Sequence, residues 1–196
     1  YGQLDVFEDV SFDVGRGERL LIMGLNGAGK TTLLKILAGR LDADLGELSL
    51  DDRVSIGYFA QEHEGIREGE SLLDHMRGSS GQGDEQLRGL MGMFGIAGGK
   101  VHQDASTLSG GEKTKLALAQ LVCGDHNLLL LDEPTNNLDP GSRTAIGSAL
   151  AGWKGTMILV SHDVEFVQAL KPDRALLMPD GTLDYFSEEM LDLVEL

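Results

Sequence analysis

Two groups of residues in this chain have the types and spacing needed to handle phosphate. The first is the run Gly-Leu-Asn-Gly-Ala-Gly-Lys-Thr at residues 24–31, which has the spacing G-x-x-x-x-G-K-[ST]. Glycines in such a run let backbone N–H groups face a phosphate at the start of the next helix. The lysine then reaches the β- and γ-phosphates, and the hydroxyl ligates Mg²⁺. The residues predicted to contact a nucleotide here are Asn26, Gly27, Ala28, Gly29, Lys30, Thr31 and Thr32.

The second group is a pair of acids, Asp132 and Glu133, which directly follows four leucines at residues 128–131. Such an apolar run predicts a strand buried on both faces of a parallel sheet. Charges at the end of a buried strand cost free energy unless a metal, a partner or a ligand compensates them. Together with the glycine run, the pair implies a nucleoside triphosphate with Mg²⁺. Asp132 is then predicted to hold the metal shell with Thr31, and Glu133 to orient and deprotonate the attacking water.

Two further side chains fit this chemistry. Gln61 follows a short strand-like run and can bridge Mg²⁺ and the attacking water, whereas His162 follows another apolar run and can hydrogen-bond the γ-phosphate. A histidine at a strand end is more often structural than functional. The predicted position of His162, at the same sheet edge as Gly24 and Glu133, favours the functional interpretation. The predicted catalytic residues are therefore Glu133, His162, Gln61 and Lys30, and the predicted metal ligands are Thr31, Gln61 and Asp132.

A second anion-receptive position is predicted at Ser109, Gly110 and Gly111, which begin an apolar-striped helix over residues 113–122. Unpaired N–H groups and the helix dipole favour an anion there. An ordinary helix cap is the alternative, and this segment by itself favours neither.

The elements that must position these residues alternate between strand-like and helical patterns. Strands are predicted at residues 10–14, 19–23, 47–50, 54–59, 128–131, 156–161, 174–178 and 182–186. Helices are predicted over residues 32–39, 71–77, 86–94, 113–122, 139–151 and 162–170, with Ser71 and Asp84 as caps and a final acidic helix after Ser187. We expect an α/β core of residues 1–61 and 125–196, and an inserted helical lobe of residues 62–124.

Composition narrows the class of protein. The 196 residues are 41% hydrophobic, enough for one sizeable domain with a core. A formal net charge of −16 argues against a surface that coats nucleic acid. Cys123 cannot form an internal disulfide, and no apolar run approaches the ~20 residues needed to span a bilayer. We expect a cytoplasmic protein without membrane insertion. Because the chain begins at Tyr1 without Met, we also expect an excised domain.

Across nearly its whole length, the sequence resembles the nucleotide-binding domain of ATP-binding cassette (ABC) proteins. Residues 24–31, Gln61, residues 108–112, residues 128–133, Asp139 and His162 match the order of Walker A, Q-loop, signature, Walker B, D-loop and H-switch. The resemblance implies a P-loop ATPase fold with a mainly parallel sheet, N-terminal antiparallel strands and the helical lobe. It also implies that Tyr1 stacks on adenine.

The resemblance further implies that two cassettes sandwich two ATP molecules head to tail. Ser109, Gly110, Gly111 and Asp139 would then serve the nucleotide bound by the partner cassette. The partner would be the second cassette of a longer chain or another copy of this domain. An isolated domain is expected to hydrolyse ATP slowly.

The segment Asp132-Glu-Pro-Thr-Asn-Asn-Leu-Asp139 and the run at residues 56–63 are similar to the ABC-F branch. The acidic tail after residues 180–182 resembles the end of the second cassette of actinobacterial members. ABC-F proteins are soluble ATPases that act on the ribosome, as translation factors or in antibiotic protection. Two alternatives stay open at this stage, an ATPase subunit of a membrane transporter and a non-enzymatic binding module. The second is disfavoured because the residues predicted for catalysis are all present.

Overall fold

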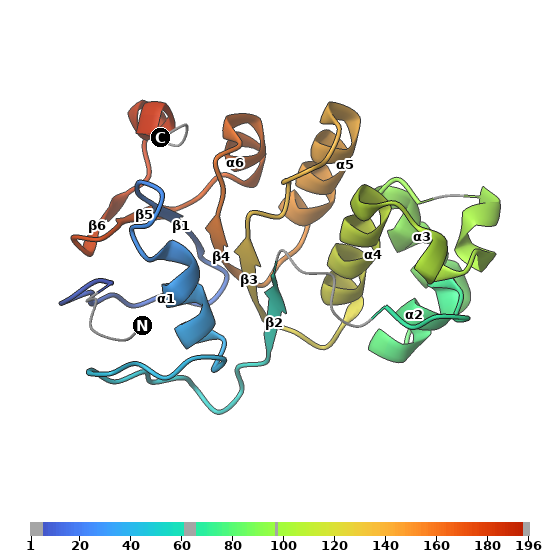
Figure 1. Cartoon of the computed structure of the whole chain (residues 1–196), viewed down its shortest axis with the longest axis horizontal. Coiled ribbons are helices and arrows are strands. Elements are labelled where there is room, and N and C mark those ends of the chain that lie inside the picture. Colours follow the sequence, from blue (N-terminus) through green and yellow to red (C-terminus); the bar gives the residue numbers. More distant parts are fainter. Residues whose placement is uncertain (1–5, 61–65, 97, 194–196) are drawn as a thin grey trace.

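The protein is built on a six-stranded sheet in the order β2-β3-β4-β1-β5-β6 (Figure 1). This computed structural model describes residues 6–60, 66–96 and 98–193. The first five strands of this order are parallel to one another, and the last, β6, pairs antiparallel with β5. The strands are β1 (Arg19–Met23), β2 (Ile56–Phe59), β3 (Leu128–Asp132), β4 (Thr156–Val160), β5 (Arg174–Leu177) and β6 (Thr182–Tyr185).

The central strands are buried on both faces because helices cover both (Figure 1). Helix α1 (Lys30–Leu37) packs with Leu130 and Ile158 on one face. Helices α5 (Pro140–Ala151) and α6 (Val164–Leu170) pack with Leu129 and Leu159 on the other. Successive strand residues point to opposite faces, so a parallel sheet covered twice must be apolar at every position. The run of leucines at residues 128–131 meets that requirement.

A group of helices packs against β2 and helix α5, at the right of Figure 1. It comprises α2 (Leu72–Ser79), α3 (Asp84–Met93), α4 (Gly110–Cys123) and short 3-10 helices at Gly98–His102 and Ala105–Thr107. Leu72, Met76, Leu87, Met91 and Leu116 are fully buried among them.

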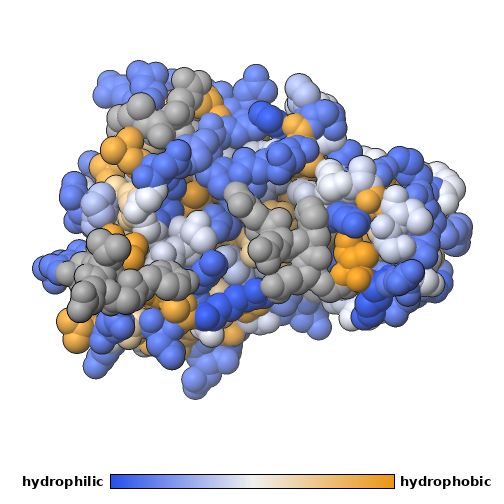
Figure 2. All heavy atoms as spheres, in the orientation of Figure 1, coloured by the Kyte–Doolittle hydropathy of each residue, from blue (hydrophilic) through white to orange (hydrophobic). Residues whose placement is uncertain are grey.

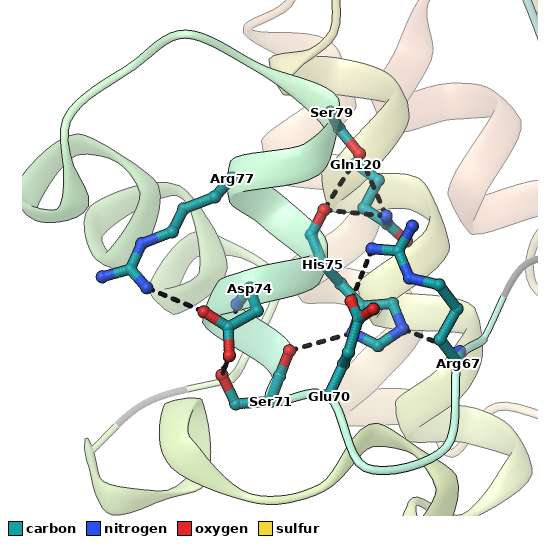
Figure 3. A network of polar contacts seen from close by, with 8 residues as sticks. All are labelled: Arg67, Glu70, Ser71, Asp74, His75, Arg77, Ser79 and Gln120. Carbon is teal, nitrogen blue, oxygen red and sulfur yellow. Dashed lines mark hydrogen bonds and ion pairs between the residues drawn. The ribbon is translucent and has the colours of Figure 1, made fainter.

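A buried histidine fixes the chain that enters this helical group (Figure 3). The backbone N–H of Arg67 donates to Nε2 of His75 at 2.9 Å, so Nδ1 carries the proton and donates to the carbonyl of Ser71 at 2.9 Å. The amide of Gln120, from α4, donates to the carbonyl of His75 at 3.2 Å. His75 thus joins the segment before α2 to both α2 and α4.

The α/β fold class with its mainly parallel sheet is confirmed, but the described residues before β1 form no antiparallel strands, and four local predictions differ from the structure. Residues 10–14 and 47–50 form no strand. Alternation of apolar residues is not enough for a strand, since a ladder partner must also lie alongside. Val10, Phe12 and Val14 instead pack against the core face that carries α1. The cap of α3 is Gly83, with Asp84 as the first helical residue, whereas Ser71 does cap α2. The C-terminal acidic segment forms a 3-10 helix, Glu188–Leu193.

Hydrophilic residues cover most of the face seen in Figure 2, and hydrophobic ones form small separate groups. Among the residues that the structure describes, no helix combines the length and apolar character needed to cross a bilayer.

Candidate functional site: a phosphate cradle facing two carboxylates

The glycine run leaves β1 at a point where a larger residue would not fit. A Cβ atom on Gly24, whose φ is +144°, would lie 2.4 Å from the carbonyl oxygen of Met178. Gly29, with φ +90°, is the N-cap of α1, and its Cβ would lie 2.8 Å from Val6 and 2.7 Å from the ring of Phe7. Both positions need glycine for the backbone conformation and for space. The loop between β1 and α1 therefore has no room for a side chain at either position.

Lys30 lies at that N-terminus, where its ammonium group bonds the loop. Nζ donates to the carbonyls of Gly24 at 2.5 Å and Leu25 at 3.1 Å. Burial lowers the pKa of Lys30, and the nearby charges of Glu133 and Asp132 partly oppose that shift. The ammonium group is thus held between the loop carbonyls and the carboxylates.

Thr31 and Asp132 place two hard oxygen donors side by side. The hydroxyl of Thr31 donates to Oδ1 of Asp132 at 3.2 Å. Asp132 is only 4% exposed, and burial raises its pKa although the Thr31 hydroxyl lowers it in part. A buried carboxylate whose charge is destabilised in this way, beside a second oxygen ligand, fits a small divalent cation such as Mg²⁺.

Glu133 and His162 meet across the ends of β3 and β4. The backbone N–H of His162 donates to Oε2 of Glu133 at 3.2 Å, and Nε2 of the imidazole lies 3.2 Å from Oε1. Burial raises the pKa of Glu133, and the charge of His162 opposes the shift. A carboxylate destabilised by burial is a stronger base than one in water, which suits a group that accepts a proton from water. Glu133 also has φ +49°, a left-handed conformation that is uncommon for a residue with a side chain.

These groups line one cavity of about 340 Å³. Its walls come from the loop after β1 and from the ends of β3 and β4, which are neighbours in the sheet. Of the predicted residues, those that line it are Asn26, Gly27, Gly29, Lys30, Thr31, Thr32, Asp132, Glu133 and His162. Ala28 does not line the cavity and packs into the core instead. Tyr1 and Gln61 lie outside the described residues.

The signature residues lie apart from this cavity. Ser109 caps α4 in a capping box, where its hydroxyl donates to Oε2 of Glu112 at 3.0 Å and accepts from the N–H of Glu112 at 3.3 Å. Lys100 pairs with the other oxygen of Glu112. The N-terminus of α4 thus already carries one carboxylate, which a lysine neutralises.

Asp139 and the two signature glycines also lie outside the cavity lining. Asp139 caps α5 through Ser142, whose N–H donates to Oδ1 at 3.0 Å. Gly110 is exposed, and Gly111 packs close to Leu138, where a Cβ would lie 3.3 Å from the leucine methyl. The lining of the cavity thus includes neither Asp139 nor the two glycines.

Sequence reasoning missed three residues that line the cavity. Val6, Asn136 and Val160 carry no motif of their own, although Asn136 lies between two predicted site residues and could have been included on that ground. Val6 enters the site through a non-local contact with Gly29, which no local pattern reports.

The site combines a glycine-rich loop, a hydroxyl, two buried acids and a histidine at the ends of three neighbouring parallel strands. This arrangement is typical of P-loop nucleotide-binding domains. The family model described as "ABC transporter" matches residues 7–136, more than half of the chain. The chain therefore belongs to the ATP-binding cassette family.

Its curated relatives are longer proteins. The chain is 39% identical over 201 residues to "Probable ATP-binding protein YheS" of Escherichia coli O6:H1, which covers 98% of the chain and 32% of the relative. It is 36% identical over 193 residues to "Probable ATP-binding cassette sub-family F member 3 homolog" of Encephalitozoon cuniculi, covering 98% and 34%. The chain thus spans about a third of these relatives, and its resemblance to one cassette of an ABC-F protein is confirmed.

Solved structures share the fold. The dimeric post-hydrolysis state of the ATP-binding cassette MJ0796 bound to ADP and Pi has a TM-score of 0.75 at 20% identity, over 93% of this chain and 91% of that one. The complex of archaeal ribosomal stalk protein aP1 with the archaeal ribosome recycling factor aABCE1 gives 0.73 at 27% identity, over 87% and 34%.

Proposed function

We propose that the chain is an ATP-hydrolysing cassette that closes head to tail on a second cassette around two Mg²⁺-ATP molecules. The observation that carries this proposal is the convergence of Lys30, Thr31, Asp132, Glu133 and His162 on one cavity. Phosphoryl transfer needs chiefly positioning and charge stabilisation, and this set supplies both. In this proposal residues 1–61 and 125–196 form the ATP-binding core, and residues 62–124 form the lobe that presents the signature.

Each group in the cavity has a proposed role. Lys30 would leave the carbonyls of the loop for the β- and γ-phosphate oxygens, which are stronger acceptors because they are charged. Glu133 would accept the proton of the attacking water, and His162 would turn from Glu133 to the γ-phosphate.

The metal would be held by Thr31 and Asp132, with Gln61 proposed as a third ligand. Bound Mg²⁺ supplies neutralisation of the charge that develops on the phosphate oxygens. The protein's part is to hold the two oxygen donors at the mouth of the phosphate cradle. Tyr1 retains its proposed place on adenine.

A second cassette would explain why the sequence has two predicted anion-receptive positions but one P-loop. Ser109, Gly110, Gly111 and Asp139 lie outside the cavity lining, so their proposed nucleotide is the one bound by the partner. The dimeric arrangement of the MJ0796 cassette supports this geometry by analogy of fold. Activity of the isolated chain should then rise more than linearly with its concentration, and strictly linear activity at full turnover would contradict the sandwich.

Two variants separate binding from chemistry. Glu133→Gln should bind ATP and lose hydrolysis, whereas Lys30→Ala should bind ATP poorly. Glu165→Gln, an exposed acid in the first turn of α6, is the matched control and should behave as the wild type. Binding is measured by fluorescence titration with an ATP analogue and hydrolysis by phosphate release. Hydrolysis at the wild-type rate in Glu133→Gln would overturn the assignment.

We also propose that the parent protein belongs to the ABC-F branch and acts in the cytoplasm on the ribosome, in translation or in antibiotic protection. The relative named for sub-family F and the structural likeness to a ribosome recycling factor support this direction. The alternative is the ATPase subunit of a membrane transporter, which the family description favours. ATP-loaded Glu133→Gln should co-sediment with ribosomes in the first case and remain in the supernatant in the second.

A further inference from the structure

The side chain of Arg143 contacts two turns at the edge of the ATP cavity. Arg143 lies in the first turn of α5, and its Nε donates to the carbonyl of Leu138 at 3.0 Å. Its Nη1 lies 3.4 Å from Oδ2 of Asp163, the N-cap of α6. The arginine side chain is 45% exposed and the aspartate side chain 12%. The guanidinium group of Arg143 therefore links the chain segment that follows β3 to the one that follows β4.

The turn after β3 needs such support. It begins at Glu133, with φ +49°, and includes Asn137, with φ +62°. Left-handed residues that carry side chains cost free energy, which surrounding contacts must offset. Two backbone bonds close the turn, from the N–H of Asn136 to the carbonyl of Glu133 and from the N–H of Leu138 to the carbonyl of Thr135, each at 3.2 Å. Arg143 holds the far end of this turn through the carbonyl of Leu138.

The turn after β4 is tied to the same glutamate. The N–H of Asp163 donates to the hydroxyl of Ser161 at 3.2 Å, and Oδ1 of Asp163 accepts from the N–H of Phe166 at 3.0 Å. The N–H of His162 donates to Glu133 at 3.2 Å. The contacts therefore close into a ring that runs from Glu133 through Leu138, Arg143, Asp163 and His162 back to Glu133.

We propose that Arg143 is a positioning residue that holds Glu133 and His162 in register and links them to the segment of Asp139. Arg143 does not line the cavity, so it acts through the two turns and not on the nucleotide. Leu138, whose carbonyl it holds, directly precedes Asp139. This part of the inference rests on the proposed function. The contact then joins Glu133 and His162, which would serve the chain's own nucleotide, to Asp139, which would serve the partner's nucleotide.

Amide hydrogen exchange tests the ring without relying on activity. In Arg143→Met, the amides of Asn136, Leu138, His162 and Asp163 should exchange about tenfold faster, because the turns that protect them lose their common anchor. Amides in α1 should be unaffected. Thr144→Val, an exposed neighbour on the same helix, is the matched control and should change neither turn. Unchanged exchange at all four amides in Arg143→Met would overturn the proposal, whether or not the chain hydrolyses ATP.

Steady-state kinetics test the consequence for the reaction. Arg143→Met should lower kcat about fivefold to tenfold and leave KM for ATP within about twofold, since the phosphate cradle is untouched. A merely structural defect would instead lower the active fraction, which active-site titration measures. A wild-type kcat in Arg143→Met would refute the positioning role.

A second substitution tests whether the two contacts act as one. Asp163→Asn retains the helix cap, since Asn caps as well as Asp, but removes the charge that faces Arg143. The double variant Arg143→Met with Asp163→Asn should be no slower than Arg143→Met alone. Multiplying effects would refute the ring. If Glu133→Gln hydrolyses as the wild type does, the proposed function fails and the exchange result by itself decides the role of Arg143.

Discussion

The carboxylate of Glu112, in the capping box at the start of α4, should contribute measurably to the free energy of unfolding. Lys100, and next the backbone and hydroxyl of Ser109, lower the pKa of Glu112 from its ordinary value of 4.5 to about 2. For a fully buried group this difference would correspond to roughly 3 kcal/mol of stability at neutral pH. The side chains of Glu112 and Lys100 are 25% and 56% exposed, so solvent screening reduces the contribution to about 1 kcal/mol. We expect Glu112→Gln to lose about that amount at pH 7.

The pH dependence follows from the direction of the shift. Because the pKa of Glu112 is depressed on folding, its contribution is complete above pH 4.5 and is lost as the pH falls from 4.5 toward 2. Urea unfolding of the wild type and Glu112→Gln should therefore differ by about 1 kcal/mol at pH 7 and by much less at pH 3. Lys100→Met should destabilise the wild type but have almost no effect in the Glu112→Gln background.

A matched control and two possible results test whether the charge of Glu112 stabilises the cap of α4. Glu85→Gln removes an exposed acid from the first turn of α3, and its effect should be smaller and independent of Lys100. If Glu112→Gln is as stable as the wild type at pH 7, the carboxylate does not stabilise the cap. If the deficit is equally large at pH 3, its origin is not the charge of Glu112.

Three further predictions concern the cavity and the core. Gly24→Ala should lower the free energy of unfolding by about 2 kcal/mol and abolish ATP binding, because its Cβ would lie 2.4 Å from a carbonyl oxygen. Gly27→Ala, whose Cβ would have no atom within 4 Å, should lower it by about 1 kcal/mol. Equal melting temperatures of the two variants would contradict this difference. Arg19→Met should cost about 3 kcal/mol in urea unfolding, because the guanidinium donates to the carbonyls of Leu170, Ala151 and Trp153 at the ends of two helices. Burial raises the pKa of Glu133, so its ionisation destabilises the nucleotide-free fold as the pH rises through its ordinary value of 4.5, and the cost is complete above the raised pKa. Glu133→Gln should therefore melt higher than the wild type at pH 7 and no higher at pH 4, and a lower melting temperature at pH 7 would refute this sign.

Much of the site could be predicted because its residues are adjacent in sequence. The run at residues 24–31 combines the glycines, Lys30 and Thr31 in one loop, and Asp132 and Glu133 directly follow the strand that presents them. Ser109, for which a helix cap was one of two predicted roles, does cap α4, since its short polar side chain bonds a free N–H group at the start of the helix.

Other features could not be predicted because they depend on contacts between distant segments. Residues 10–14 and 47–50 alternate as strands do, yet they have no ladder and remain irregular. In the sequence, nothing distinguishes Arg143 from an ordinary exposed arginine of a helix. The packing of α5 against α6 places its side chain between the turns that follow β3 and β4. Val6 reaches the cavity because the chain before the first strand folds over Gly29.

The sequence by itself determined the residue types available at the candidate site, the class of the protein and the kinds of elements that carry the site. Those properties are local, since glycine conformations, helix caps and apolar runs act over a few residues. The tertiary structure decided that β3, β4 and β1 are neighbours, which brings Glu133, His162 and Lys30 to one cavity. It also decided the burial that shifts the pKa values of Asp132, Glu133 and Lys30, because desolvation depends on every segment packed around a charge.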